Sequence, residues 1–87
     1  MLGKQLVRSG TSVGANVREA LQGQSKADFT AKMSIALKEA SESEYWLELL
    51  RDTDYLSKSE YESIHADCIE VIKMLTSIVK TSRKKIP

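Results

Sequence analysis

The sequence is poor in the residues that interrupt helices. Its only proline is Pro87, the last residue, and its four glycines all lie within the first 23 positions, so no later position disfavours a helix. Cys68 is the only cysteine, which excludes an internal disulfide and is typical of a reducing cytosol. Apolar runs are too short for a membrane span, and no secretion signal is visible. These absences predict a cytoplasmic helical protein without a membrane partner.

The short chain limits how much core one copy can build. With 87 residues it forms one domain at most, and a domain of this size buries only about 60–65% of its unfolded surface. Disulfides are excluded, so association between copies is the remaining source of buried area. We therefore expect a homo-oligomer.

Capping patterns divide the chain into helices. Ser25 is followed three residues later by Asp28, and Ser57 is followed at the same spacing by Glu60, a full capping box. Small residues at 9–14 interrupt the apolar pattern of the first segment, where we expect a kink near 10–12. We expect three helices, over about 2–21, 26–52 and 58–82, with a basic tail at 80–87.

Apolar and small residues recur at alternating spacings of four and three. Such spacing keeps one side of a helix, here called its seam, against a partner helix. The sequence thus predicts an all-α antiparallel up-down bundle. The seam residues of the two later segments are Phe29, Met33, Ala36, Ala40, Ser43, Leu47 and Leu50, and then Tyr61, Ile64, Cys68, Val71, Leu75 and Ile78.

A second apolar stripe lies opposite the first seam. Ile35, Trp46 and Leu49 form it, and one antiparallel neighbour cannot cover both sides of a helix. Ordinary three-helix packing is one explanation. We favour an interface between subunits, because an exposed Trp–Leu patch is a liability on a monomer.

Charge is strongly segregated along the chain, although the net charge is only +1. Residues 1–38 carry +4, residues 39–70 carry −8 and residues 71–87 carry +5. Up-down topology gathers the positive segments at one end, which is attractive to a nucleic-acid backbone. The alternative is that the last lysines only stabilise a helix C-terminus. The candidate contact residues are Arg18, Lys26, Lys32, Lys73, Lys80, Arg83, Lys84 and Lys85.

Catalytic and metal-binding patterns are missing. His65 and Cys68 are too few for a zinc site, so we expect both to pack, and no cofactor or small-molecule substrate is indicated. Glu44 lies at the edge of its seam, and a half-buried carboxylate needs a partner. We expect it to fix helix register through a polar network with Arg8 or Asn16 rather than to catalyse a reaction.

Four motifs carry a family resemblance. They are RSGTSVGAN at 8–16, QSKADF at 24–29, KMSIALKEA at 32–40 and EYWLELL at 44–50. In this order they resemble the bacterial four-helix-bundle proteins of the 23S rRNA intervening-sequence family, over about residues 2–79. The resemblance implies a left-handed up-down bundle that assembles as a homo-pentamer, with no catalytic residues. A related branch, the accessory variability proteins of diversity-generating retroelements, is basic and binds nucleic acid.

The sequence departs from that family pattern at its start. Members usually carry another helix of about 25 residues ahead of the segment that matches Leu2, whereas this sequence begins there with Met1. The helix was lost, the coding start is misassigned, or the sequence is a fragment. In each case we expect a groove along the core, filled by another chain or a swapped segment.

Two functions compete at this stage. The first is a non-enzymatic oligomeric bundle that contacts RNA or DNA backbone through its basic end. The alternative is a structural or protein–protein interaction module without nucleic-acid binding.

Overall fold

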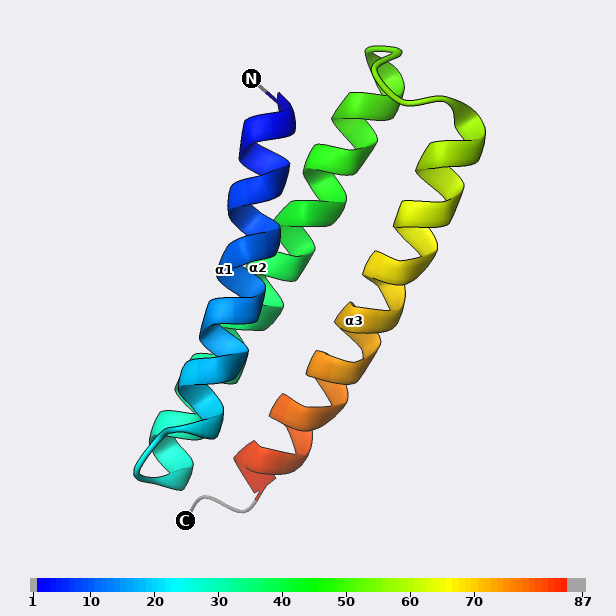
Figure 1. Cartoon of the computed structure of the whole chain (residues 1–87). Helices are drawn as coiled ribbons and strands as arrows, with labels where there is room; N and C mark the ends of the chain where they lie inside the picture. Colours follow the sequence, from blue (N-terminus) through cyan, green and yellow to red (C-terminus); the bar gives the residue numbers. More distant parts are fainter. Residues whose placement is uncertain (1, 85–87) are drawn as a thin grey trace.

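Three α-helices make up the computed structural model, which describes residues 2–84. They are α1 (Leu2–Leu21), α2 (Lys26–Asp52) and α3 (Lys58–Lys84), and no strand occurs in this range. Successive helices run antiparallel, so in the view of Figure 1 the chain passes down, up and down along a body about 47 Å long. The last residues of the predicted basic tail, 85–87, lie outside the described range.

Side-chain caps set the starts of α2 and α3. The Asp28 N–H donates to Ser25 Oγ at 3.0 Å, so α2 begins at the predicted residue. At α3, the Glu60 N–H donates to Ser57 Oγ at 3.1 Å, and the Ser57 N–H donates to Glu60 Oε1 at 2.9 Å. The hydrogen bonds from Ser57 also lower the pKa of the Glu60 carboxyl.

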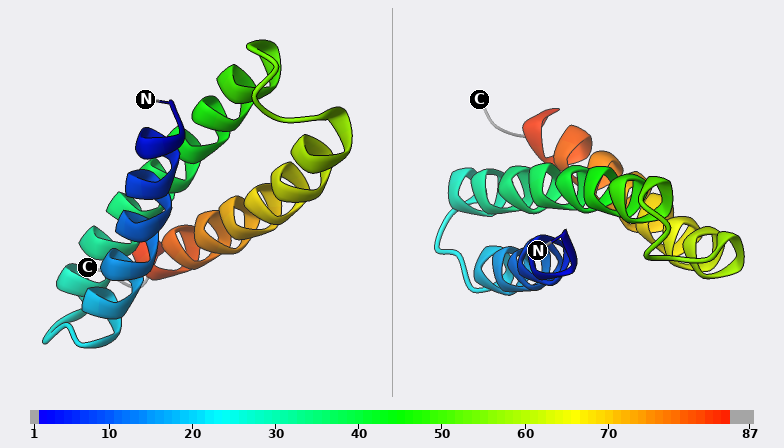
Figure 2. Two further views of the ribbon diagram at one scale, coloured as in Figure 1. Left: turned by 45° about the horizontal axis from the view of Figure 1, so that its top comes forward. Right: turned by 90° about the horizontal axis from the view of Figure 1, so that it is seen from above.

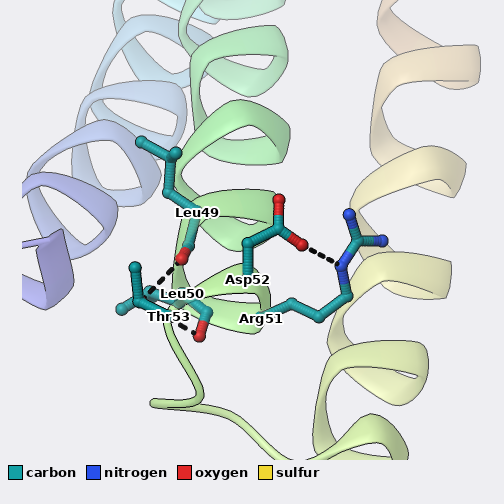
Figure 3. A network of polar contacts seen from close by, with 5 residues as sticks. All are labelled: Leu49, Leu50, Arg51, Asp52 and Thr53. Carbon is teal, nitrogen blue, oxygen red and sulfur yellow. Dashed lines mark hydrogen bonds and ion pairs between the residues drawn. The ribbon is translucent and has the colours of Figure 1, made fainter.

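The end of α2 is held by local polar contacts (Figure 3). The Thr53 hydroxyl donates to the Leu49 carbonyl at 2.7 Å, and Arg51 Nε pairs with Asp52 Oδ1 at 2.9 Å. Asp54 follows with φ 63°, the left-handed conformation that often ends a helix and that Asp tolerates. The chain thereby turns away within a few residues and enters α3.

The chain is not interrupted near residues 10–12, because α1 continues as one helix from Leu2 to Leu21. Gly10 takes an ordinary negative φ, and a Cβ at that position would meet no atom within 4 Å outside its own helix. Ser9 is fully buried against the bundle. Packing of this small-residue side therefore keeps the helix continuous where propensity alone disfavours it.

Gly23 permits the tight turn between α1 and α2. A Cβ at this position would lie 3.1 Å from the Ala20 carbonyl oxygen and 3.3 Å from the Asp28 Cβ. A larger residue would push the two helix ends apart. This close approach lets α1 fold back along α2 directly.

The core lies on α2, which packs against both neighbours, whereas the backbones of α1 and α3 do not approach each other closely. Seen from above (Figure 2, right), α3 crosses α2 obliquely, and its C-terminal end lies on the side of α2 away from α1. Ala36 and Ala40 are fully buried at mid-helix, so small side chains bring the neighbours close. The buried core cluster is Ala20, Met33, Ala36, Ala40, Leu75 and Val79.

We expect the substitution Ala36→Leu to destabilise the fold by about 1–3 kcal/mol, because Ala36 has no exposed surface and a larger side chain must displace packed neighbours. Thermal and urea unfolding followed by circular dichroism measures the change. The matched control is Ala27→Leu in the exposed first turn of α2, where stability should change little. Equal effects of the two substitutions would contradict the close packing at Ala36.

Candidate nucleic-acid interface

Three cations meet in one cleft at the C-terminal end of α3. We call it the basic cleft; it measures about 460 Å³ and is lined by Leu37, Thr76, Val79, Lys80, Arg83 and Lys84. Helical spacing explains the gathering, since positions three and four apart share one side of a helix. Val79 and Leu37 supply an apolar floor beneath the charged groups.

The charges of the basic cleft are not offset along their own helix. No acidic residue occurs after Glu70, and no carboxylate lines the cleft. Arg83 reaches across to α2, where its Nη2 donates to Ser34 Oγ at 3.4 Å. Lys80 and Lys84 are exposed. The cleft can therefore hold an anion without first breaking an ion pair between described residues.

The other predicted contact residues are spread more widely. Lys32 pairs with Glu19 of α1 at 3.4 Å, which offsets part of its charge. Arg18 is exposed in the last turn of α1, and Lys73 is exposed on α3. Lys85 lies outside the described residues. Of the seven predicted cations that the structure describes, it thus brings three together in the basic cleft and leaves Arg18, Lys26, Lys32 and Lys73 outside its lining.

A second cleft flanks the same end of α3. It measures about 400 Å³, and we call it the Phe29 cleft, lined by Lys26, Phe29, Ser77, Ile78, Thr81 and Ser82. Phe29 belongs to the predicted seam of α2, and its cleft also contains Lys26. No local pattern could have found this cleft, because its two walls are about 50 positions apart in sequence.

A group of acidic residues lies at the opposite end of the molecule, around the turn between α2 and α3 (Figure 1). Asp52, Asp54 and Glu60 belong to this turn or its flanks and are exposed. The segregation seen in the sequence is therefore spatial, with the basic cleft at the other end of α3.

An apolar groove runs between α1 and α3 and has α2 as its floor. It measures about 320 Å³. Ile64 and Val71 on its α3 wall are exposed, and Asp67 is its only charged lining residue. The groove exists because the backbones of α1 and α3 each lie close to α2 but not to each other. Its lining residues are Leu6, Gly10, Val13, Ala40, Ser43, Leu47, Ile64, Asp67, Cys68 and Val71.

The predicted interface stripe on α2 is only partly exposed. Ile35 is 41% exposed, whereas Trp46 and Leu49 are half-buried. Tyr45 is 55% exposed and packs edge-on against Trp46, with ring centroids 5.0 Å apart. The Trp46 indole N–H is buried without an acceptor among the described residues. The exposed part of this face is therefore Ile35 and Tyr45 rather than Trp46.

The expected polar network of Arg8, Asn16 and Glu44 does not form. Arg8 donates to Gln5 at 2.6 Å, and Asn16 donates to the Ser12 carbonyl at 2.9 Å, both within α1. Glu44 instead pairs with His65 of α3, at 2.8 Å between Oε2 and Nε2. The helical angle correctly placed Glu44 at a seam edge, but α3 rather than α1 lies on that side.

His65 and Cys68 help to attach α3 to α2. The His65 ring stacks on the Tyr61 ring, with centroids 5.0 Å apart. The Arg51 guanidinium lies over the Tyr61 ring, 4.5 Å from its centroid. Cys68 Sγ donates to the Ala40 carbonyl at 3.6 Å. Within residues 2–84, no three His, Cys, Asp or Glu side chains gather as a metal site. No described helix has the length and apolarity to cross a membrane.

The described residues form an all-α antiparallel array of three helices with a basic end and an acidic end. Comparison with known proteins identifies the protein family. The family described as 23S rRNA-intervening sequence protein matches residues 1–77. The chain belongs to this family. The sequence resemblance is thereby confirmed.

A solved structure supports the same assignment. It is the 1.70 Å crystal structure of a protein of unknown function from the S23 ribosomal protein family of Bacteroides thetaiotaomicron VPI-5482. The two chains are 59% identical with a TM-score of 0.89, and the match covers 92% of this chain and 71% of that one. Comparison with curated proteins finds no match.

We expect Cys68 to react slowly with iodoacetamide in the folded protein. Burial raises the pKa of its thiol, and the nearby Glu44 carboxylate raises it further, so less of the reactive thiolate is present at a given pH. Glu44→Gln removes that negative charge, lowers the pKa and should accelerate alkylation at pH 8 by less than about tenfold, since tenfold corresponds to a full pKa unit. Mass spectrometry over time measures the rate.

The matched control for this experiment is Glu62→Gln, which removes an exposed carboxylate from α3. It should leave the alkylation rate unchanged. A rate in the folded protein equal to that in urea would contradict the buried environment of Cys68.

Proposed function

We propose that this protein is a non-enzymatic oligomeric bundle that contacts RNA or DNA backbone through the basic end of α3. One observation carries the proposal: Lys80, Arg83 and Lys84 line a single cleft that contains no carboxylate. Cations held close together bind phosphates and release counterions from the nucleic acid. The family description, which refers to 23S rRNA, is consistent with an RNA ligand.

The expected mode of contact is electrostatic and tolerant of sequence. The three cations lie on flexible side chains at a helix end, and Lys80 and Lys84 are exposed. Such groups follow phosphates rather than read base edges. Lys26 extends the same positive end from α2, because it lines the neighbouring Phe29 cleft.

Reversing the charge of the two exposed lysines of the basic cleft tests the proposal. We expect Lys80→Glu combined with Lys84→Glu to weaken binding of structured RNA and duplex DNA by at least about tenfold at low salt. The slope of log K against log salt should become shallower by about 1.4–1.8, since each lost phosphate contact contributes about 0.7–0.9. Fluorescence anisotropy across a salt series measures both quantities.

The matched control is Lys4→Glu combined with Lys58→Glu. It changes the net charge equally, but both lysines are exposed near the end of the molecule opposite the cleft. Binding should stay close to that of the unaltered protein. If both double variants weaken binding equally, or if affinity does not depend on salt, the proposed contact surface is wrong.

Association between copies is the second part of the proposal. The apolar groove offers a continuous apolar surface with exposed Ile64 and Val71, and an apolar surface of this kind favours a protein partner. Ile35 and Tyr45 are two further exposed large side chains on α2. Side-by-side packing of copies would bring several basic clefts together and strengthen nucleic-acid binding through multivalency.

We expect the protein to sediment faster than its 9.7 kDa monomer at micromolar concentration, and Val71→Lys in the groove to shift the distribution toward the monomer, because a charge there must be desolvated on association. Sedimentation velocity measures the shift. Tyr55→Lys is the control, since Tyr55 is 76% exposed in the α2–α3 turn. A stable monomer of the unaltered protein would contradict association.

A protein-interaction module without nucleic-acid binding is the alternative function. The apolar groove is the observation that favours it, since such a surface can hold an apolar helix of another protein. In that case, the fluorescence anisotropy of labelled nucleic acid would not change on addition of the protein at any salt concentration. Val71→Lys would still weaken binding of the protein partner in the groove.

A further inference from the structure

The Phe29 cleft combines three kinds of group that rarely meet at the end of a bundle. Lys26 supplies a cation, Phe29 an aromatic ring, and Ser77, Thr81 and Ser82 supply hydroxyls. Its volume of about 400 Å³ lies within the range of pockets that accept small organic groups. The cleft is distinct from the basic cleft, which has no aromatic residue.

The aromatic wall of the cleft is held in place from behind. Phe29 is half-buried and packs against the core cluster on one side, while it lines the cleft on the other. Its backbone N–H donates to the Ser25 carbonyl at 3.0 Å, which fixes it in the first turn of α2. A ring anchored in this way loses little freedom when a planar group stacks on it.

The opposite wall is also tied to the core. The hydroxyls of Ser82 and Thr30 share a hydrogen bond, and Thr30 is buried. Ser77 and Thr81 are exposed. Unlike the Ser82 hydroxyl, which is bonded to Thr30, their hydroxyls form no hydrogen bond with another described residue. They can therefore donate to or accept from the polar edge of an incoming ring.

The surroundings of the cleft suit a phosphate beside that ring. Lys26 is the first residue of α2, so the cleft lies beside a helix N-terminus, the positive end of the helix dipole. Asp28, the acidic residue of this turn, does not line the cleft. On the other side of α3, the basic cleft supplies three more cations.

We propose that the Phe29 cleft accepts one unpaired nucleobase of a bound single strand, which stacks on Phe29 while Lys26 contacts the adjacent phosphate. The inference rests on the proposed function and names its ligand as single-stranded rather than fully paired nucleic acid. The neighbouring phosphates of the strand then pass over the end of α3 into the basic cleft. Base–aromatic stacking of this kind tolerates any base.

The experiment compares two RNA strands of about 12 nucleotides with equal phosphate charge. One has an unstructured mixed sequence, and the other carries abasic sugars throughout. We expect the intact strand to bind the unaltered protein about 5- to 150-fold more tightly, with equal salt slopes, because stacking adds affinity without adding ion pairs. Equal affinities overturn the base-accepting cleft while leaving backbone binding intact.

Variants assign the difference to Phe29. Phe29→Leu keeps an apolar side chain but removes the ring, so it should weaken binding of the intact strand and leave the abasic strand unaffected; Phe29→Trp should restore the difference. Tyr55→Leu, which removes an exposed ring at the acidic end, is the matched control. Loss of affinity for both strands together, or no loss in Phe29→Leu, overturns the assignment.

Two further measurements separate the possible failures. Thr81→Leu fills the mouth of the cleft from an exposed position with an aliphatic side chain that cannot stack on a base, so it tests the site without altering the core even if Phe29→Leu fails to fold. It should abolish the difference between the strands, and a retained difference overturns the proposal. If neither strand binds the unaltered protein at low salt, the proposed function itself fails, and the cleft proposal falls with it.

Discussion

The packing of α2 is the constraint on which the rest of the structure depends. Its small residues Ala36, Ala40 and Ser43 are buried at mid-helix and allow close neighbours. Both other helices pack closely on α2, and their own backbones stay apart. Burial of apolar side chains is the main favourable term in folding. Here most of the buried apolar residues either lie on α2 or pack against it. The apolar groove and the two clefts beside the end of α3 are the places that this arrangement leaves uncovered.

The same arrangement determines how charge is displayed. Because α3 returns from the acidic turn to the start of α2, its basic C-terminal residues reach the end where Lys26 begins α2 (Figure 1). A chain with a net charge of +1 thus has one positively charged end and one negatively charged end. The oblique crossing of α3 over α2 (Figure 2) separates the basic cleft from the Phe29 cleft, one on each side of α3.

Local signals in the sequence predicted the helices well, because caps act over three or four residues. Ser25 and Ser57 mark the starts of α2 and α3 as expected. The small residues at 9–14 do not interrupt α1, since the buried Ser9 and its packing outweigh the low helix propensity of Gly10. Helix propensity is a weak prior that tertiary packing overrides.

The candidate site was less predictable, because it depends on which helix lies beside which. Periodicity placed Glu44 at a seam edge but could not choose His65 over Arg8 as its partner. Likewise, clustering of basic residues in sequence indicated a positive end, but only the fold separates the three cations of the basic cleft from Lys32, which pairs with Glu19. Phe29 satisfies the seam pattern and also lines a cleft, and no sequence period distinguishes these two roles.

The backbones of α1 and α3 do not approach each other closely, yet the two helices share one core. Ala20 of α1 and Leu75 and Val79 of α3 belong to a single buried cluster that is completed by α2. A change in the packing of α2 therefore reaches both outer helices at once. The cations of the basic cleft directly follow Val79 on α3, so the position of the cleft is tied to the same cluster.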